Sequence, residues 1–184
     1  MSGTTAPRRH REAPVYARTM PDLAYIASLP RTRGAAAALL LDDLGRIVLV
    51  KPTYKEGWFL PGGVIEEGES PLAACERECR EELGFTPRLT GLVCVDWGPP
   101  RDGVDAVNIF VFAGHVSDAE LAAITLPPDE LSDHTLAAPE KVAELAPAHI
   151  ARRMGPALRG MAGHRAFYLE DGRDPGLPDQ ATAP

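Results

Sequence analysis

Apolar runs separated by short polar or glycine-containing breaks predict a domain that contains both strands and helices. Between Gly34 and Tyr54, the run AAAALLLDD is followed by LGRIVLVKPTY. Aliphatic runs of this length favour strands, and the acidic pair with Gly45 between them favours a hairpin turn. The next segment, GWFLPGG, predicts a short aromatic strand that ends in a glycine turn. The first part of the domain is therefore expected to be mainly β-structure.

A well-delimited helix is predicted to follow. Ser70 is a typical N-cap residue, and Pro71 suits the first helical position because it lacks the amide hydrogen that would have no partner there. Gly84 is a typical helix stop. At about 100° per residue, one arc of this helix carries the apolar side chains that we expect to face the core. These are Leu72, Cys75, Cys79 and Leu83.

The rest of the chain predicts more strands and then more helix. RLTGLVCVDW and DAVNIFVFAGHV are typical of strands, and GPPRDGV separates them. A Pro- and Asp-rich loop is expected at 126–133, helices at about 139–145 and 148–161, and a last strand at AFYL. This order predicts an α/β domain at 34–170 whose sheet is covered on both faces. A partly flexible N-terminal extension (1–33) and a Pro/Gly-rich C-terminal tail (171–184) would flank it.

Composition limits the functions that this domain can have. The chain has 184 residues, enough for one domain, and a formal net charge of -7. An acidic surface disfavours non-specific binding to nucleic acid or to anionic membranes. Three cysteines without disulfide-scaffold spacing favour a reducing compartment. We find neither a signal-peptide pattern nor a membrane-length apolar run, so a cytoplasmic protein is expected.

Three glutamates of the predicted helix share one face. Glu78 and Glu82 are one helical turn apart, and Glu81 lies beside them. Like charges at this spacing repel, at a cost of roughly 0.2–0.5 kcal/mol per pair on an exposed helix. Mg²⁺ or Mn²⁺ held among the carboxylates would explain why they are kept together, because these ions prefer oxygen ligands. The alternative is an acidic, solvated helix face without a metal.

Gly63, Glu69, Arg77 and the three glutamates belong to a longer pattern. The segment GGVIEEGESPLAACERECREELGF resembles the signature of the Nudix hydrolases, G-x5-E-x7-R-E-U-x-E-E-x-G-U, where U is aliphatic. The matching residues, in order, are Gly63, Glu69, Arg77, Glu78, Cys79, Glu81, Glu82, Gly84 and Phe85. Cys79 and Phe85 replace aliphatic residues, and both are apolar enough to face a core.

The resemblance implies a fold and a division of roles within this segment. It implies a Nudix-type α/β/α sandwich with a mixed β-sheet, in which the segment forms a catalytic loop-helix-loop. Glu78 and Glu82 would hold Mg²⁺ or Mn²⁺, with Glu81 as a further ligand or general base and the Gly63 carbonyl as an additional ligand. Arg77 and Glu69 would pair and hold the loop against the helix, and Gly84 would complete the structural set.

The same resemblance implies hydrolysis of a diphosphate linkage. The substrate would be a small molecule in which a nucleoside diphosphate is joined to another moiety, such as a nucleoside triphosphate or ADP-ribose. The bound cation would lower the pKa of a water molecule and neutralise phosphate oxygens. It would also reverse the local sign of the field, so that an acidic protein could bind an anionic substrate. The sequence leaves the oligomeric state open, including a homodimer.

Five residues outside the motif are candidates for substrate contacts. Trp58 and Phe59 could stack on a base, although core packing is favoured for at least one of the two. Pro100 lies where a proline resembles a marker of ADP-ribose-cleaving members, but a Pro-Pro turn needs no substrate. Glu130 and His134 are expected in a late loop, where some members place a base or a substrate contact, and the alternative is an exposed acidic loop. His10, His115, His149 and His164 lack ligand spacing and receive no role.

Three other functions are alternatives to a Nudix hydrolase. A non-catalytic ligand-binding or sensor module of the same fold would be expected to have lost motif glutamates, whereas all are present here. An isopentenyl diphosphate isomerase shares the fold but requires a cysteine in a separate motif, for which Cys94, within a strand pattern, is a poor candidate. A purely structural acidic protein would not require the full motif.

Overall fold

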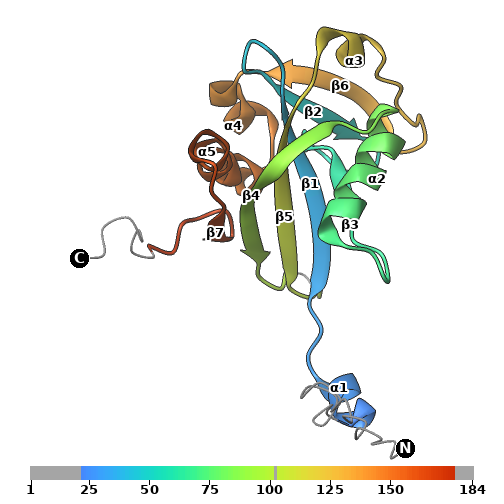
Figure 1. Cartoon of the computed structure of the whole chain (residues 1–184), viewed down its shortest axis with the longest axis vertical. Helices are drawn as coiled ribbons and strands as arrows, with labels where there is room; N and C mark the ends of the chain where they lie inside the picture. Colours follow the sequence, from blue (N-terminus) through green and yellow to red (C-terminus); the bar gives the residue numbers. More distant parts are fainter. Residues whose placement is uncertain (1–21, 102, 177–184) are drawn as a thin grey trace, which may run out of the picture. The chain divides into compact units, whose positions relative to one another are not determined.

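The computed structural model describes residues 22–101 and 103–176 (Figure 1). The chain divides into two units, Met1–Arg31 and Thr32–Pro184. In the first unit, α1 (Leu23–Ser28) is capped by Asp22, whose carboxylate accepts a hydrogen bond from the Ala24 amide at 3.1 Å. The flexibility predicted for the extension concerns residues 1–21, and these lie outside the described residues, as does the tail from 177 onward.

A mixed seven-stranded sheet forms the centre of the second unit, counted over its described residues. Its strands are β1 (Arg33–Leu41), β2 (Ile47–Pro52), β3 (Gly62–Val64), β4 (Arg88–Gly98), β5 (Val107–His115), β6 (Leu131–Ala137) and β7 (Phe167–Glu170). The strand order is β6-β2-β1-β5-β4-β7, and β3 also pairs with β1. The β1–β5 and β4–β7 pairs are parallel, and the other pairs are antiparallel. Since β2 and β3 both pair antiparallel with β1 at different registers, the sheet forks along this strand.

The predicted hairpin between β1 and β2 is present. Leu41 is paired with Ile47, and the side chain of Asp42 organises the turn. One Asp42 carboxylate oxygen accepts hydrogen bonds from the amides of Leu44 and Arg46, at 3.0 and 2.8 Å. The other accepts one from Arg46 Nε at 2.6 Å. The acidic residue is therefore a structural part of the turn.

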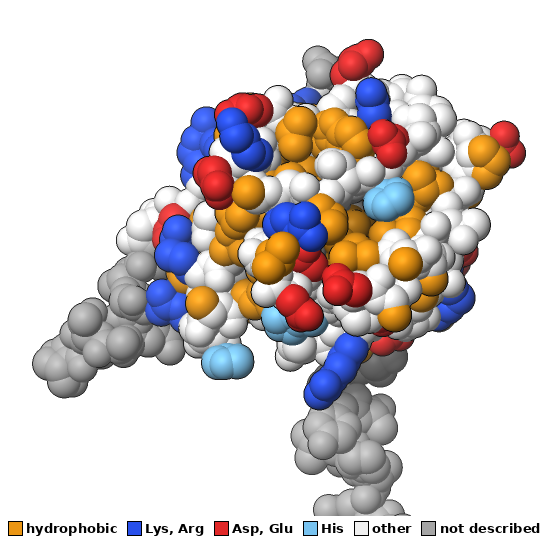
Figure 2. All heavy atoms as spheres, turned by 90° about the horizontal axis from the view of Figure 1, so that it is seen from above, with side chains coloured by type: hydrophobic (Ala, Val, Ile, Leu, Met, Phe, Trp, Pro, Cys, Tyr) orange, Lys and Arg blue, Asp and Glu red, His pale blue; other side chains and the backbone are white. Residues whose placement is uncertain are grey.

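Helices cover both faces of the sheet, as predicted (Figure 1). They are α2 (Pro71–Leu83), α3 (Asp118–Ala122), α4 (Val142–Leu145), α5 (Ala148–Gly163) and the short 3-10 helix η2 (Pro139–Lys141). Successive β1 residues alternate between the faces, so that Leu40 joins a core with α2 and Leu39 joins one with α5. No helix within the described ranges is long and apolar enough to cross a bilayer. On the face shown in Figure 2, acidic and basic side chains are interspersed among hydrophobic ones.

Several local predictions were wrong. Leu72 is 44% exposed, and Ala74 is buried with Cys75, Cys79 and Leu83 instead. A helical wheel gives the direction of a side chain but cannot say whether the sheet extends beneath the first turn. In GWFLPGG, Phe59 forms only a single bridge with Val50, and the strand is made by the glycines that follow.

The predicted loop at 126–133 ends earlier than expected, because β6 begins at Leu131 and pairs with β2. Polar residues in LSDHTLA hide this strand from a hydrophobicity pattern, since it lies at the sheet edge. The first residues of the predicted tail, from 171, belong to an ordered turn after β7. Residues 170–173 form a tight turn in which the Glu170 and Arg173 amides each donate to the other residue's carbonyl, at 2.8 and 3.0 Å.

A buried ion pair connects α5 to β4. Arg153 Nε donates to Asp96 Oδ2 at 2.8 Å, and the Arg153 Nη2 to Asp96 Oδ2 distance is 2.7 Å. Both side chains are at least 95% buried. The second Asp96 oxygen accepts a hydrogen bond from the Gly172 amide at 2.9 Å. One carboxylate thus joins a strand, a helix and the turn after β7.

We predict that Asp96→Ala lowers the free energy of unfolding by about 3–5 kcal/mol, because it leaves the Arg153 charge buried without its partner. Glu144→Ala is the control, since it removes an exposed pair with Lys141 and should cost less than about 1 kcal/mol. Urea unfolding measures both variants. Equal midpoints for the two would contradict the assigned role of Asp96.

Candidate active site

Local capping fixes the position of α2 against β3. Ser70 Oγ accepts a hydrogen bond from the Ala73 amide at 3.2 Å, and Pro71 opens the helix as predicted. Gly84 ends it with φ 84°, a left-handed conformation that glycine adopts without steric cost. The buried thiols of Cys75 and Cys79 face the sheet. The glutamates are consequently turned toward the loop and strand that precede the helix.

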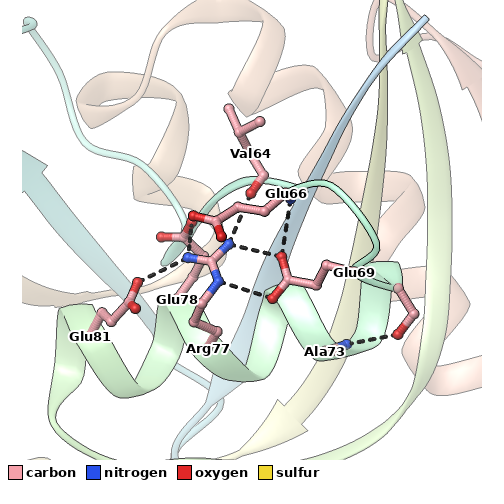
Figure 3. Close-up of polar contacts among 8 residues, drawn as sticks. Val64, Glu66, Glu69, Ala73, Arg77, Glu78 and Glu81 are labelled. Atoms are coloured by element: carbon pink, nitrogen blue, oxygen red, sulfur yellow. Dashed lines mark hydrogen bonds and ion pairs between the residues drawn. The ribbon is translucent and has the colours of Figure 1, made fainter.

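Arg77 connects the helix to that loop (Figure 3). Its Nε and Nη2 bind the two oxygens of Glu69 at 2.9 and 3.0 Å, and Nη2 also donates to the Val64 carbonyl at 3.0 Å. Nη1 donates to Glu78 Oε1 and Glu81 Oε2, both at 2.9 Å. The Arg77–Glu69 pair that the resemblance implies is therefore present. The bond to Glu69 is the main cause that raises the pKa of Arg77, so this guanidinium stays charged.

Glu78 and Glu82 both lie against the glycines of β3. Glu82 Oε2 accepts a hydrogen bond from the Gly62 amide at 2.7 Å. A Cβ atom on Gly63 would lie only 2.4 Å from Glu78 Oε1, and one on Gly62 would lie 2.2 Å from the Ala36 carbonyl oxygen. Gly62 is required for the close approach to the β1 backbone, whereas a side chain at position 63 would displace the Glu78 carboxylate.

Burial makes both carboxyl groups harder to ionise. It raises the pKa of Glu82 to about 7, with smaller contributions from Glu78 and Glu130, whereas the Gly62 amide and Lys55 act in the opposite direction. Burial also raises the pKa of Glu78, and the charges of Glu81 and Glu130 add to this, while Arg77 opposes it. Two neighbouring carboxyl groups whose pKa values are both raised are typical of functional sites.

The arrangement fits a hard divalent cation in its donor chemistry. Glu78 and Glu82 offer carboxylate oxygens beside the β3 backbone, and an added positive charge would relieve their repulsion. Across 22–101 and 103–176, no group of three or more His, Cys, Asp or Glu side chains already converges as a metal site. Arg77 Nη1 binds both Glu78 and Glu81, and the Glu81 side chain is 55% exposed. Glu82 is bound instead by the Gly62 amide.

A pocket of about 440 Å³ borders β3, although Glu78, Glu81 and Glu82 are not among its lining residues. Gly62 and Gly63 form part of its wall, so the strand that contacts Glu78 and Glu82 also borders the pocket. Tyr54, Lys55 and Phe59 line the same side. Lys55 Nζ lies 3.9 Å from the centre of the Phe59 ring. Burial lowers the pKa of Lys55, and Glu82 opposes this shift.

Four of the five substrate candidates outside the motif do not line this pocket. Trp58 packs against the core and donates its amide hydrogen to the Leu145 carbonyl, and Phe59 takes the pocket position. Pro99 lines the pocket in place of Pro100. His134 belongs to β6 and is paired with Val50.

Glu130 remains associated with the carboxylates. Its charge contributes to raising the pKa values of Glu78 and Glu82. Its carbonyl oxygen accepts the Thr53 amide at 2.9 Å, which ties the loop before β6 to the segment that carries Lys55.

Sequence reasoning missed the residues that line the rest of the pocket. Lys55 lies in the loop before the motif, Arg101 lies between β4 and β5, and His149 begins α5. None of these three residues belongs to a sequence motif that indicates a catalytic or binding role. One signal was present for Asp171, because an Asp-Gly pair after a strand is typical of a tight turn.

All three cysteines are free and buried. The hydrogen bond with Cys75 is the main cause that raises the pKa of Cys79, and burial adds to it. Burial also raises the pKa of Cys94, to about 12. Neutral thiols are poor nucleophiles and poor metal ligands. Their burial agrees with the prediction that Cys75 and Cys79 are small core residues.

The mixed sheet lies between helices, which is the arrangement of an α/β/α sandwich. Its glutamate-rich helix, α2, packs against the short glycine-containing strand β3. A family model described as the NUDIX domain matches residues 31–158, and the chain belongs to this family.

The fold is similar to several solved structures. A UDP-X diphosphatase aligns with a TM-score of 0.64 at 21% identity, over 84% of this chain and 78% of that one. An Ap4A hydrolase from C. elegans, solved as a binary complex, aligns with a TM-score of 0.60 at 17% identity, over 72% of this chain and 99% of that one. At such identities the likeness establishes the fold alone.

Curated relatives match over shorter segments. An ADP-ribose pyrophosphatase from Methanocaldococcus jannaschii is 34% identical over 87 residues, which are 46% of this chain and 52% of that protein. An RNA pyrophosphohydrolase from Psychrobacter sp. is 38% identical over 61 residues, which are 33% of this chain and 35% of that protein. The chain thus spans about half or less of the length of these two relatives.

We predict that Glu82→Gln stabilises the metal-free protein more at pH 8 than at pH 5. The pKa of Glu82 is about 7 when folded and about 4.3 when unfolded, so ionisation lowers the free energy of unfolding as the pH rises through this window. Glutamine removes this loss, which is roughly 3.5 kcal/mol at pH 8 and about 1 kcal/mol at pH 5. Urea unfolding in excess chelator measures it. If Glu82→Gln changed the free energy of unfolding by the same amount at both pH values, the raised pKa of Glu82 would be contradicted.

Proposed function

We propose that the chain is a divalent-metal-dependent hydrolase that cleaves a diphosphate linkage in a nucleoside diphosphate joined to another moiety. The observation that carries this proposal is the contact of Glu78 and Glu82 with a strand that also forms the wall of the 440 Å³ pocket. A substrate that binds along β3 would therefore lie close to both the pocket and the carboxylate pair. The relatives named as pyrophosphatases support diphosphate as the group cleaved.

Glu78 and Glu82 would hold Mg²⁺ or Mn²⁺ together with the Gly63 carbonyl. The cation, when bound, supplies charge neutralisation for phosphate oxygens and acidifies a water molecule. Arg77 keeps Glu78 oriented and ties the loop to the helix through Glu69. Glu81 is the most exposed of the three motif carboxylates, and its Oε1 would take the proton from the attacking water while Oε2 stays bonded to Arg77.

The other half of the substrate would occupy the pocket. Phe59 and Tyr54 provide aromatic surface for a base, and Lys55 provides a positive charge between this surface and Glu82. Three buried, free thiols fit a reducing compartment, which supports a cytoplasmic location. A purely ligand-binding role would not require two carboxylates to be held together at a cost in repulsion.

We expect hydrolysis of at least one of ADP-ribose, ATP, a dinucleoside polyphosphate or UDP-glucose to require Mg²⁺ or Mn²⁺ and to stop in excess EDTA. Glu78→Gln and Glu82→Gln should each lower kcat at least about 100-fold, because they remove the charge that holds the cation. Glu76→Gln, on the same helix but outside the cluster around Arg77, is the matched control and should stay within about twofold.

Chromatographic separation of the nucleotide products, such as AMP from ADP-ribose or UMP from UDP-glucose, tests the proposal on this panel. Full turnover in EDTA would exclude the metal role, and unchanged rates in both glutamine variants would exclude the assignment of Glu78 and Glu82. The absence of turnover on the whole panel, with metal bound by the folded protein, would favour the non-catalytic module.

A further inference from the structure

The Lys55 ammonium lies over the face of the Phe59 ring. Nζ is 3.9 Å from the ring centre, and the ring atoms would prevent an approach this close within the ring plane. The Tyr54 ring centre lies 5.3 Å from the same nitrogen. Within the described part of the chain, these two rings are the partners of the ammonium, which forms no hydrogen bond or ion pair. Lys55 is therefore held by cation–π attraction.

Phe59 is the fixed member of this contact. Its amide and its carbonyl each share a hydrogen bond with the backbone of Val50, both at 2.9 Å, and its side chain packs against the core on the α5 side of the sheet. Lys55 belongs to the irregular segment 53–57, and its charge ends a flexible four-carbon stem. The ammonium can thus leave the ring, whereas the ring cannot withdraw from the ammonium.

The ring lies close to the carboxylate pair. Phe59 precedes Gly62 by three residues, which limits the distance between their Cα atoms to roughly 11 Å. The Gly62 amide binds Glu82 at 2.7 Å, and Lys55, Phe59 and Gly62 line the same pocket. Burial lowers the pKa of Lys55, and the charge of Glu82 opposes this shift. The ammonium is therefore within electrostatic range of the position proposed for the diphosphate.

A nucleotide base and the Lys55 ammonium compete for one ring face. A base stacks on an aromatic side chain by covering its face, and Lys55 covers that face of Phe59 in the free protein. Because the side chain also packs against the core, the face under Lys55 is the one that a ligand in the pocket can reach. A base can stack on Phe59 only if the ammonium moves.

We propose that Lys55 and a nucleotide exchange places on Phe59, so that the base takes the ring when the nucleotide binds and the ammonium moves to the phosphates. The inference rests on the proposed function for the position of those phosphates. Base and phosphate are then recognised together, because the base replaces the ammonium on the ring and the phosphate becomes its new partner.

The exchange favours a ligand that carries both groups. A cation–π contact at an exposed site is weaker than a hydrogen bond between two charged groups, so the ammonium gains when it moves from the ring to a phosphate. A nucleoside without phosphate would displace Lys55 and offer it no partner. Pyrophosphate without a base would attract the ammonium and leave the Phe59 ring uncovered.

Lysine methylation makes the free state observable. The chain has three lysines, Lys51, Lys55 and Lys141, and reductive methylation with ¹³C-formaldehyde labels them beside the amino terminus while it keeps their charge. The ring current of Phe59 should shift the Lys55 methyl signal upfield of the Lys141 signal in the NMR spectrum. Lys55→Ala assigns the signal by removing it, and Phe59→Leu should abolish the upfield shift.

A nucleotide that resists hydrolysis tests the exchange. In α,β-methylene-ADP, a methylene group replaces the oxygen between the two phosphates. Its addition with Mg²⁺ should remove the upfield shift of the Lys55 signal and leave the Lys141 signal unchanged. A Lys55 signal that is not shifted in the free protein, or that keeps its shift when the protein is saturated with nucleotide, overturns the proposal.

The affinities of Lys55→Ala supply a second readout with opposite expected signs. In equilibrium dialysis, α,β-methylene-ADP should bind this variant at least about 10-fold more weakly than the unaltered protein. Adenosine should bind it at least as tightly, because the ring is no longer covered. A parallel loss of affinity for both ligands would indicate a merely structural role for Lys55 and overturn the exchange.

Lys51→Ala is the matched control. Lys51 Nζ lies 5.9 Å from the centre of the Trp58 ring, and neither residue lines the pocket. This variant therefore removes a lysine from a neighbouring aromatic ring without uncovering Phe59. Both affinities should stay within about twofold of those of the unaltered protein.

The two proposals fail separately. Turnover of a panel substrate with a Lys55 signal that does not move on nucleotide binding overturns the exchange and leaves the hydrolase intact. Loss of the upfield shift on nucleotide binding, without turnover of any panel substrate, overturns the hydrolase and leaves the exchange. If α,β-methylene-ADP fails to bind the folded protein in Mg²⁺, the exchange is overturned.

Discussion

Arg77 donates hydrogen bonds to three carboxylates and one backbone carbonyl, and the geometry of the site depends on these contacts. Glu69 and Val64 belong to the loop and strand, whereas Glu78 and Glu81 belong to the helix. One planar cation therefore fixes the distance between β3 and α2 and, with it, the position of the Glu78 carboxylate against Gly63. A lysine could not replace it, because a single ammonium group cannot form the fork that binds both oxygens of Glu69.

The motif segment could be predicted almost completely from sequence because its signals are local. Ser70, Pro71 and Gly84 act on the helix ends through their own side chain or backbone, and the structure places the helix bounds where these residues indicate. The hydrophobic strands were equally readable, since their alternating residues face two cores. The wrong predictions concern β6, the segment around Phe59 and the turn after β7, all of which depend on distant partners.

The pocket could not be predicted for the same reason. Lys55, Arg101 and His149 come from three segments far apart in sequence, and only the sheet order brings them to one cavity. Net charge was also a poor guide, because the total of -7 does not reveal that three arginines and three aspartates meet at one end of the pocket.

The tight turn at Asp171 and Gly172 lies beyond residue 158, where the match to the family model ends. It nevertheless forms part of the pocket wall and is bonded to Asp96 in the middle of the sheet. The segment that closes the pocket is thus separable in sequence from the one that carries the carboxylates. Replacing residues of this turn therefore alters the pocket wall without touching the helix or its glutamates.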